Sequence, residues 1–256
     1  YPDAPTEGIR RVLETAHDLK IPKGTLLSVD TIESIKMGTT VATNALLERN
    51  GAKVALLTSK DFRDVLEIGN QTRPDLFNIS ARKLDQLYSK VVEIDERITL
   101  VNYTEGGGGL EHETNADAEA ITGDLIRIIE TPNISKVKLQ LEELKAEGYS
   151  SLAICFLHSY LYPKHEQQVA KVARSLGFQV SVSTELQPTM GIVDRCSSTV
   201  ADAYLLPKIQ EYLVGFGSGF QGGLKAMGNK LLFMQSNGGL CPWNKFTGLR
   251  AILSGP

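Results

Sequence analysis

Apolar residues recur at helical spacing in several stretches of the chain and form short unbroken runs between them. The helical pattern covers residues 7–19, 134–148 and 164–176. The unbroken runs predict buried strands at 53–58, 152–157, 178–182 and 230–234. Helix, strand, helix and strand follow one another from 134 to 182, and this order predicts a βαβ unit in a mainly parallel sheet.

Less regular stretches give further expectations. Residues 26–35 and 91–100 read as strands, the latter with Asp95, Glu96 and Arg97 as surface charges, and 61–69 reads as a short helix closed by Gly69. Thr6 is expected to cap the first helix. A helix over 194–206 is expected to be cut by Pro207 and to resume over 208–216, and 251–253 is expected to be a strand.

The segment from Lys36 to Gly51 combines a small, hydroxyl-rich turn with an amphipathic helix. Gly38 allows close backbone approach, while Thr39, Thr40 and Thr43 offer hydroxyl groups. The free amides at a helix start favour an anion. The helix is expected to bury Ala45, Leu46 and Leu47 and to end at Gly51 in the left-handed conformation. An ordinary capped helix is the alternative interpretation.

A second turn follows the predicted strand 230–234, with the sequence Gln235-Ser236-Asn237-Gly238-Gly239. Polar residues at the carboxyl end of a buried strand lie where α/β proteins bind ligands. A plain Asn-Gly turn is the alternative. The chain ends in Ser254-Gly255-Pro256, which we interpret as the start of a phosphate-type loop in a truncated chain.

Other polar residues are weaker candidates. The guanidinium of Arg73 could bind a carboxylate, or it could be a solvated loop residue. Asp194 and Arg195 could be a site pair or the first turn of a helix, with Asp194 as its N-cap. His158 and His165 are expected to be structural. The four glycines at 106–109 are expected to form a hairpin tip or a disordered excursion.

Composition excludes several classes of protein. The formal net charge of −3 leaves no basic footprint for nucleic acid, and no apolar run has the length of a membrane span. The start of the chain does not read as a signal peptide. Cys155, Cys196 and Cys241 lie far apart and show no zinc or disulfide spacing, which favours free thiols in the cytoplasm. Cys155 is expected in the core. Cys196 could lie near a site, but a lone cysteine is a weak candidate for a nucleophile.

Several segments together resemble the hydantoinase/5-oxoprolinase family, most closely its eukaryotic-type ATP-dependent 5-oxoprolinase branch. They occur in the family's order, from about residue 30 to the last residue, and comprise 37–49, 69–77, 155–160, 201–205, 234–239 and 253–256. The resemblance implies an α/β fold of the ribonuclease-H-like, actin-like ATPase class, with mixed, mainly parallel sheets and flanking helices, truncated at both ends. It assigns residues 1–183 to the family's N-terminal region and 184–256 to an incomplete ATPase domain. A subdomain boundary is expected between 178 and 195.

The reaction that the resemblance implies is ATP-driven opening of 5-oxo-L-proline to L-glutamate. Phosphorylation of the amide oxygen would make an unreactive lactam open to water, with magnesium neutralising the phosphates and potassium as a further candidate ion. The intact protein would act in the cytoplasm on a small cyclic amide, with a homodimer as its candidate assembly and without nucleic-acid or membrane partners. The fragment alone is expected to be inactive.

The resemblance also suggests site residues. A substrate or phosphate turn is expected at Gly38, Thr39, Thr40 and Asn44, facing Ser236, Asn237 and Gly238. Gly255 would begin a nucleotide loop, and Arg73 would bind the substrate carboxylate. No residue is assigned as general base and no metal ligand is assigned.

The family's Asp-Gly-Gly-Thr motif is absent, and Met37 stands where the family often has histidine. A hydantoinase, an acetone-carboxylase-type subunit and a non-catalytic binding domain on the same scaffold are the alternatives.

Overall fold

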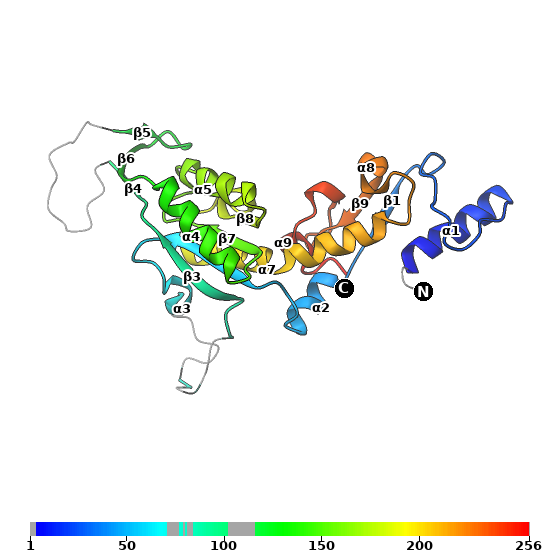
Figure 1. The fold of residues 1–256 in the computed structure, drawn as a ribbon, viewed down its shortest axis with the longest axis horizontal. Coiled ribbons are helices and arrows are strands. Elements are labelled where there is room, and N and C mark those ends of the chain that lie inside the picture. Colours follow the sequence, from blue (N-terminus) through cyan, green and yellow to red (C-terminus); the bar gives the residue numbers. More distant parts are fainter. Residues whose placement is uncertain (1–3, 71–76, 79, 81–83, 102–115, 256) are drawn as a thin grey trace. The chain divides into compact units, whose positions relative to one another are not determined.

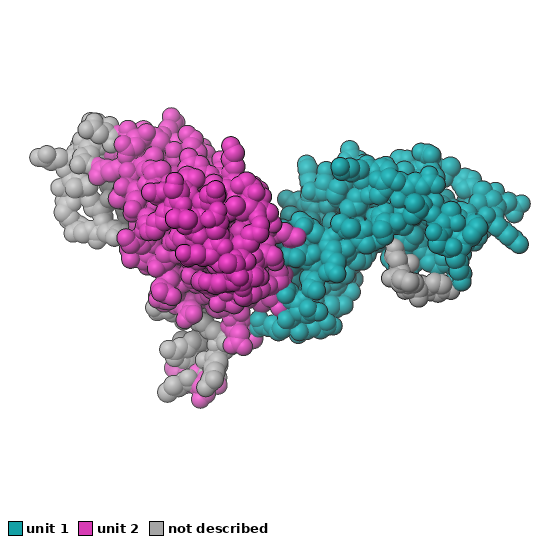
Figure 2. Space-filling view, in the orientation of Figure 1, with its two compact units in different colours: residues 1–51, 205–256 teal, residues 52–204 magenta. Residues whose placement is uncertain are grey.

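The computed structural model describes residues 4–70, 77–78, 80, 84–101 and 116–255 (Figure 1). Arg73 and the glycine run 106–109 therefore lie outside the described residues. The chain forms two compact units (Figure 2). Unit 1 combines residues 1–51 with 205–256, and unit 2 comprises residues 52–204.

Unit 2 is built on a parallel sheet of four strands in the order β3-β2-β7-β8. The predicted strands at 53–58, 152–157 and 178–182 are β2, β7 and β8 of this sheet. Its elements are β2 (Val54–Ser59), α3 (Val65–Ile68), β3 (Tyr88–Ile94), α4 (Ile134–Ala146), β7 (Ser151–Cys155), α5 (Lys164–Ser175), β8 (Gln179–Val182) and α6 (Ser183–Leu186).

The two faces of this sheet differ in chemistry. Alternate residues such as Leu57 and Ile154 pack with Leu141 of α4 and Val169 of α5 in one apolar core. The opposite face mixes apolar residues such as Leu56 with hydroxyl groups, and Ser181 Oγ donates to the Asp202 carboxylate at 2.6 Å. The helical pattern predicted α4 and α5 correctly, because both helices bury an apolar stripe on the first of these faces.

The stretch expected as one strand over 91–100 is two strands in different sheets. β3 ends at Ile94, and β4 (Arg97–Leu100) starts an antiparallel sheet in the order β4-β6-β5 with β5 (Ala118–Glu119) and β6 (Leu125–Glu130). Glu96, predicted as a surface charge, is 2% exposed at the corner between them. It is buried because His165 Nδ1 lies 3.0 Å from its carboxylate and Ser59 donates to it.

Unit 1 contains a small sheet in the order β1-β9-β10. β1 pairs with β9 in parallel, and β10 returns antiparallel to β9. Its elements are α1 (Ala4–His17), β1 (Ile35–Met37), α2 (Val41–Leu47), α8 (Gly223–Met227), β9 (Leu231–Met234), β10 (Leu240–Pro242) and α9 (Gly248–Ala251), with 3₁₀ turns at Gly228–Lys230 and Trp243–Lys245.

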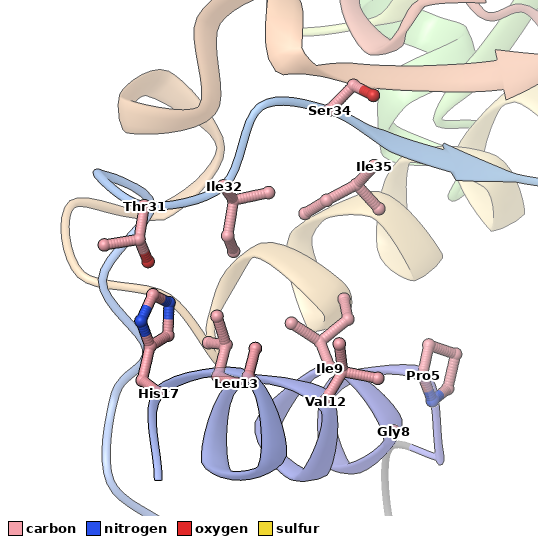
Figure 3. A pocket seen from close by; sticks show the side chains of 11 residues that line it. Pro5, Gly8, Ile9, Val12, Leu13, His17, Thr31, Ile32, Ser34 and Ile35 are labelled. Carbon is pink, nitrogen blue, oxygen red and sulfur yellow. The ribbon is translucent and has the colours of Figure 1, made fainter. Parts of the chain in front are cut away.

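The first helix begins earlier than the sequence suggested. α1 starts at Ala4, so Thr6 is inside it and is not its cap, because Pro5 fits the first turn of a helix. Ile9 and Leu13 of α1 and Ile32 and Ile35 point toward one another across a cavity of about 470 Å³ (Figure 3).

Two other expectations in unit 1 are wrong at their boundaries. Residues 28–34 lie outside any strand and turn at 30–31, where Ser28 Oγ donates to Asp30 at 2.8 Å, so the strand starts only at Ile35. α2 ends at Leu47, which is 78% exposed, and Arg49 rather than Gly51 takes the left-handed conformation, with φ at 54°.

α7 (Ile192–Gly217) is one continuous helix that contains Pro207, whereas the sequence predicted a break there. Proline lacks an amide hydrogen, so the carbonyl four residues earlier, that of Ala203, loses its helical partner. Ser151 Oγ donates to that carbonyl at 2.6 Å. Ala52 N donates to the next carbonyl, of Tyr204, at 2.9 Å. These bonds satisfy the carbonyls that a proline disturbs. No helix among the described residues is long and apolar enough to cross a membrane.

Candidate functional site

Two predicted ligand turns follow neighbouring strands of unit 1. Met37, the last residue of β1, pairs with Phe233 of β9, and the strands are parallel. The turn at residues 38–40 and the turn at residues 235–239 therefore leave the same edge of the sheet. The carboxyl edge of parallel strands is the usual ligand edge in α/β proteins.

The first turn presents some polar groups to solvent and withholds others. Gly38, Thr40 and Asn44 are exposed, whereas Thr39 is 8% exposed. Thr39 Oγ1 accepts from Val41 N at 3.3 Å, and Asn44 Nδ2 donates to Thr40 Oγ1 at 3.4 Å. Of the hydroxyl groups predicted to bind a ligand here, that of Thr40 is therefore the accessible one.

The second turn is held by its own backbone. Gln235 N donates to Gly239 O at 2.7 Å, and Gly238 N donates to Gln235 O at 2.9 Å. Asn237 Oδ1 accepts from Gly239 N at 3.0 Å. Gly238 has φ at 80° and open space where a Cβ would stand, so glycine suits both the turn and the approach of a ligand.

Residues 250–255, called here the bridging segment, contact both turns. Ser236 Oγ donates to Arg250 O at 2.8 Å and accepts from Leu253 N at 3.1 Å. Ser254 Oγ donates to Thr39 O at 2.9 Å. The segment is not the strand that the sequence suggested, because Thr247 caps the short helix α9 by accepting from Arg250 N at 3.4 Å.

The structure thus gathers most of the predicted site residues in one unit. Gly38, Thr39, Thr40, Asn44, Ser236, Asn237, Gly238 and Gly255 all belong to unit 1. The sequence predicts no role for the side chain of Ser254 and no contact for Thr43. Thr43 Oγ1 donates to Ile252 O, 209 residues away along the chain. A hydroxyl next to a predicted loop glycine was the only signal for Ser254.

The exposed groups of these turns are suited to phosphate oxygens. The hydroxyl of Thr40 and the amides of Asn44 and Asn237 are donors, and Gly238 leaves the backbone open. Neutral donors and bare backbone are common parts of phosphate cradles. Among the described residues, no three His, Cys, Asp or Glu side chains lie together as a metal site.

A second polar cluster lies at the carboxyl edge of the unit 2 sheet, and it is closed to solvent. Arg195 is 1% exposed and donates to Phe156 O at 2.9 Å and Ser183 Oγ at 3.0 Å. The Glu166 carboxylate lies 3.9 Å from it and accepts from Thr184 Oγ1 at 2.8 Å. Of the two alternatives for Arg195, the buried ion pair supports a structural role.

The two cysteines near this edge and His165 are also internal. Cys155 and Cys196 are both fully buried, and a hydrogen bond with Cys155 together with burial raises the pKa of the Cys196 thiol well above its usual value. A thiol of that kind is a poor nucleophile at neutral pH. His165 is 3% exposed and bonds to Glu96.

Comparison with known proteins identifies relatives over the whole chain. The family described as the hydantoinase/oxoprolinase N-terminal region matches residues 1–177, and the hydantoinase/oxoprolinase family matches residues 195–256. A Saccharomyces cerevisiae protein named 5-oxoprolinase is 46% identical over all of this chain, and 5-oxoprolinase 1 of Arabidopsis thaliana is 44% identical. The chain spans 20% of the length of each.

A solved structure shares the fold. The ATP-dependent caprolactamase from Pseudomonas jessenii aligns with a TM-score of 0.72 at 24% identity, over 100% of this chain and 34% of the caprolactamase. The fold expected from the sequence, a mixed α/β arrangement with a mainly parallel sheet, is confirmed. From these matches and the motifs that carry them, the chain belongs to the hydantoinase/oxoprolinase family.

Proposed function

We propose that this chain is part of an ATP-dependent enzyme that opens 5-oxo-L-proline to L-glutamate. The observation that carries the proposal is the 44–46% identity, over the whole chain, to proteins named 5-oxoprolinase. The chain covers one fifth of their length, so the activity is proposed for the full-length protein and not for residues 1–256 alone.

In this proposal the turns of unit 1 hold the phosphates or the lactam. Thr40, Asn44 and Asn237 donate hydrogen bonds to ligand oxygens, and Gly238 lets the ligand approach the backbone. Gly38 and Gly255 take part by keeping the first turn and the bridging segment in close contact. Thr39 and Ser236 support the turns from within. ATP, when bound, supplies the phosphoryl group that activates the lactam oxygen, with magnesium as its counter-ion. Arg73 remains the predicted partner of the substrate carboxylate.

The proposal extends to the setting of the enzyme. We place the full-length protein in the cytoplasm as a homodimer acting on a small cyclic amide, without nucleic-acid or membrane partners. Division into an N-terminal region over residues 1–183 and the start of an ATPase domain over residues 184–256 also remains a prediction.

The test is a substrate panel on the full-length protein, with ADP and the opened product measured together. We expect ADP and glutamate in equal amounts from 5-oxoproline. A hydantoin, caprolactam and acetone with bicarbonate are the competing substrates. ADP release without glutamate, or faster turnover of a competing substrate, would contradict the assignment. An intact protein that binds 5-oxoproline but releases no ADP would favour the non-catalytic alternative.

A further inference from the structure

The bridging segment connects the two turns through side-chain hydroxyl groups. Ser236 is bonded to the Arg250 carbonyl and the Leu253 amide, and Ser254 is bonded to the Thr39 carbonyl. Thr43 of α2 adds a bond to the Ile252 carbonyl. The bonds of Ser254 to Thr39 and of Thr43 to Ile252 join residues 215 and 209 positions apart in the sequence. The two bonds of Ser236 span 14 and 17 residues.

The chemistry of these hydroxyls separates them from ligand donors. Ser254 is 5% exposed, and its one hydrogen is directed at the carbonyls of Thr39 and Ala251, at 2.9 and 3.0 Å. The Ser236 hydroxyl already donates one bond and accepts another. A hydroxyl has one hydrogen to donate, so neither serine has a donor left for a phosphate oxygen.

The backbones of the bridging segment and the first turn are also in close contact. A Cβ built on Gly255 would lie 2.4 Å from Thr40 Cγ2 and 2.9 Å from Thr39 O. A Cβ on Gly38 would lie 3.1 Å from Ser254 O. Because the bridging segment and the first turn are packed this closely, a shift of the segment displaces the turn.

We propose that Ser254 and Ser236 are positioning residues that fix the spacing between the two ligand turns. Ser254 holds the Gly38-Thr39-Thr40 turn and Ser236 holds the Gln235–Gly239 turn, each against the bridging segment. The inference rests on the proposed function, because it assumes that ATP or its substrate contacts these turns. It assigns to both serines a role that requires no contact with the ligand.

The experiment compares Ser254→Ala with Ser218→Ala in the full-length protein. The Ser218 hydroxyl donates to Gly215 O at 2.6 Å in the same unit, so the control also removes one hydroxyl–carbonyl bond, but not one between the turns. Because small displacements of positioned groups are costly in catalysis, we expect Ser254→Ala to raise the KM for ATP by about tenfold or more. Ser218→Ala is expected to leave it unchanged.

A second variant covers the case in which Ser254→Ala does not fold. Thr43→Val keeps the shape of the side chain and removes its bond to Ile252 O, and we expect a rise of KM in the same direction. A merely structural role would reduce the amount of active enzyme and leave KM unaltered. A KM for ATP within about twofold of wild type in every folded variant would overturn the inference.

Amide hydrogen exchange on the same full-length proteins provides a readout independent of activity. We expect faster exchange over residues 38–47 in Ser254→Ala than in Ser218→Ala, and unchanged exchange there would count against the inference. If the wild-type protein opens no lactam but this exchange pattern is found, the proposed function fails and the positioning role stands. If lactam opening is normal and the variants behave like Ser218→Ala, the positioning role fails alone.

Discussion

Breaking the buried ion pair of unit 2 should destabilise it far more than breaking a surface pair. Arg195→Met removes the charge next to Glu166, which has no exposed surface. The carboxylate would keep its bonds from Phe156 N at 2.9 Å, Ser183 Oγ at 2.6 Å and Thr184 Oγ1 at 2.8 Å, but its charge would be unpaired. We therefore expect the free energy of unfolding to fall by about 3–5 kcal/mol.

A matched control is present in the same unit. Arg174 and Glu185 form an ion pair at 2.7 Å, and both side chains are 46% exposed. Arg174→Met should cost no more than about 1 kcal/mol, because solvent screens exposed pairs. Urea unfolding followed by far-UV circular dichroism measures both variants.

A double variant checks the cause. Arg195→Met combined with Glu166→Gln leaves no unpaired charge, so it should lose less stability than the two single changes summed, by about 1 kcal/mol or more. If Arg195→Met costs no more than Arg174→Met, or if the double variant is additive, an unpaired buried charge is not what destabilises unit 2.

Three further predictions concern other parts of the chain. Ser151→Ala should lower the free energy of unfolding in urea by about 1–2 kcal/mol, because it leaves the buried Ala203 carbonyl of α7 without a donor. Adding Pro207→Ala should restore that loss by returning the helical amide, and a double variant as unstable as Ser151→Ala would contradict this. Gly255→Ala should lower kcat/KM of the full-length enzyme by about tenfold, whereas Gly215→Ala, which has open space at its Cβ, should not; equal activities would exclude the close contact. Hydrogen bonds from two arginines lower the pKa of Glu7 to about 2, so the stability that this carboxylate adds to α1 is present above about pH 4.5 and lost as the pH falls toward 2. An acid titration of helix content should show this loss in wild type and not in Glu7→Gln.

The sequence predicted the elements whose packing surface is visible in the local pattern of apolar residues. α4 and α5 have regular apolar stripes and close with Gly148 and Gly177, both at positive φ. β2 and β7 each contain an unbroken apolar run, and every residue of both strands is buried. In each case the pattern that predicts the element also forms its packing surface, so the element can be predicted without knowing its distant partners.

The wrong expectations share a dependence on distant residues. Glu96 reads as a surface charge until His165, 69 residues later, is placed beside it. Pro207 reads as a break until Ser151, 52 residues before Ala203, satisfies the freed carbonyl. Periodicity carries no information on such partners.

The candidate site was likewise predicted in its local parts but not in its long-range contacts. Both turns were found in the sequence because glycine and hydroxyl residues follow buried strands. Their connection through residues 250–255 was not found, because it depends on bonds such as that of Ser254 to Thr39, which spans 215 residues.

The three cysteines provide each unit with its own reporter of opening. Cys155 and Cys196 lie in unit 2 and Cys241 lies in unit 1, and all three are free and buried. A thiol reagent can reach such residues only when the surrounding structure opens, so labelling rates resolved by mass spectrometry would give the opening free energy of each unit separately. The natural sequence therefore allows the cooperativity between the two units to be measured without introducing a single probe.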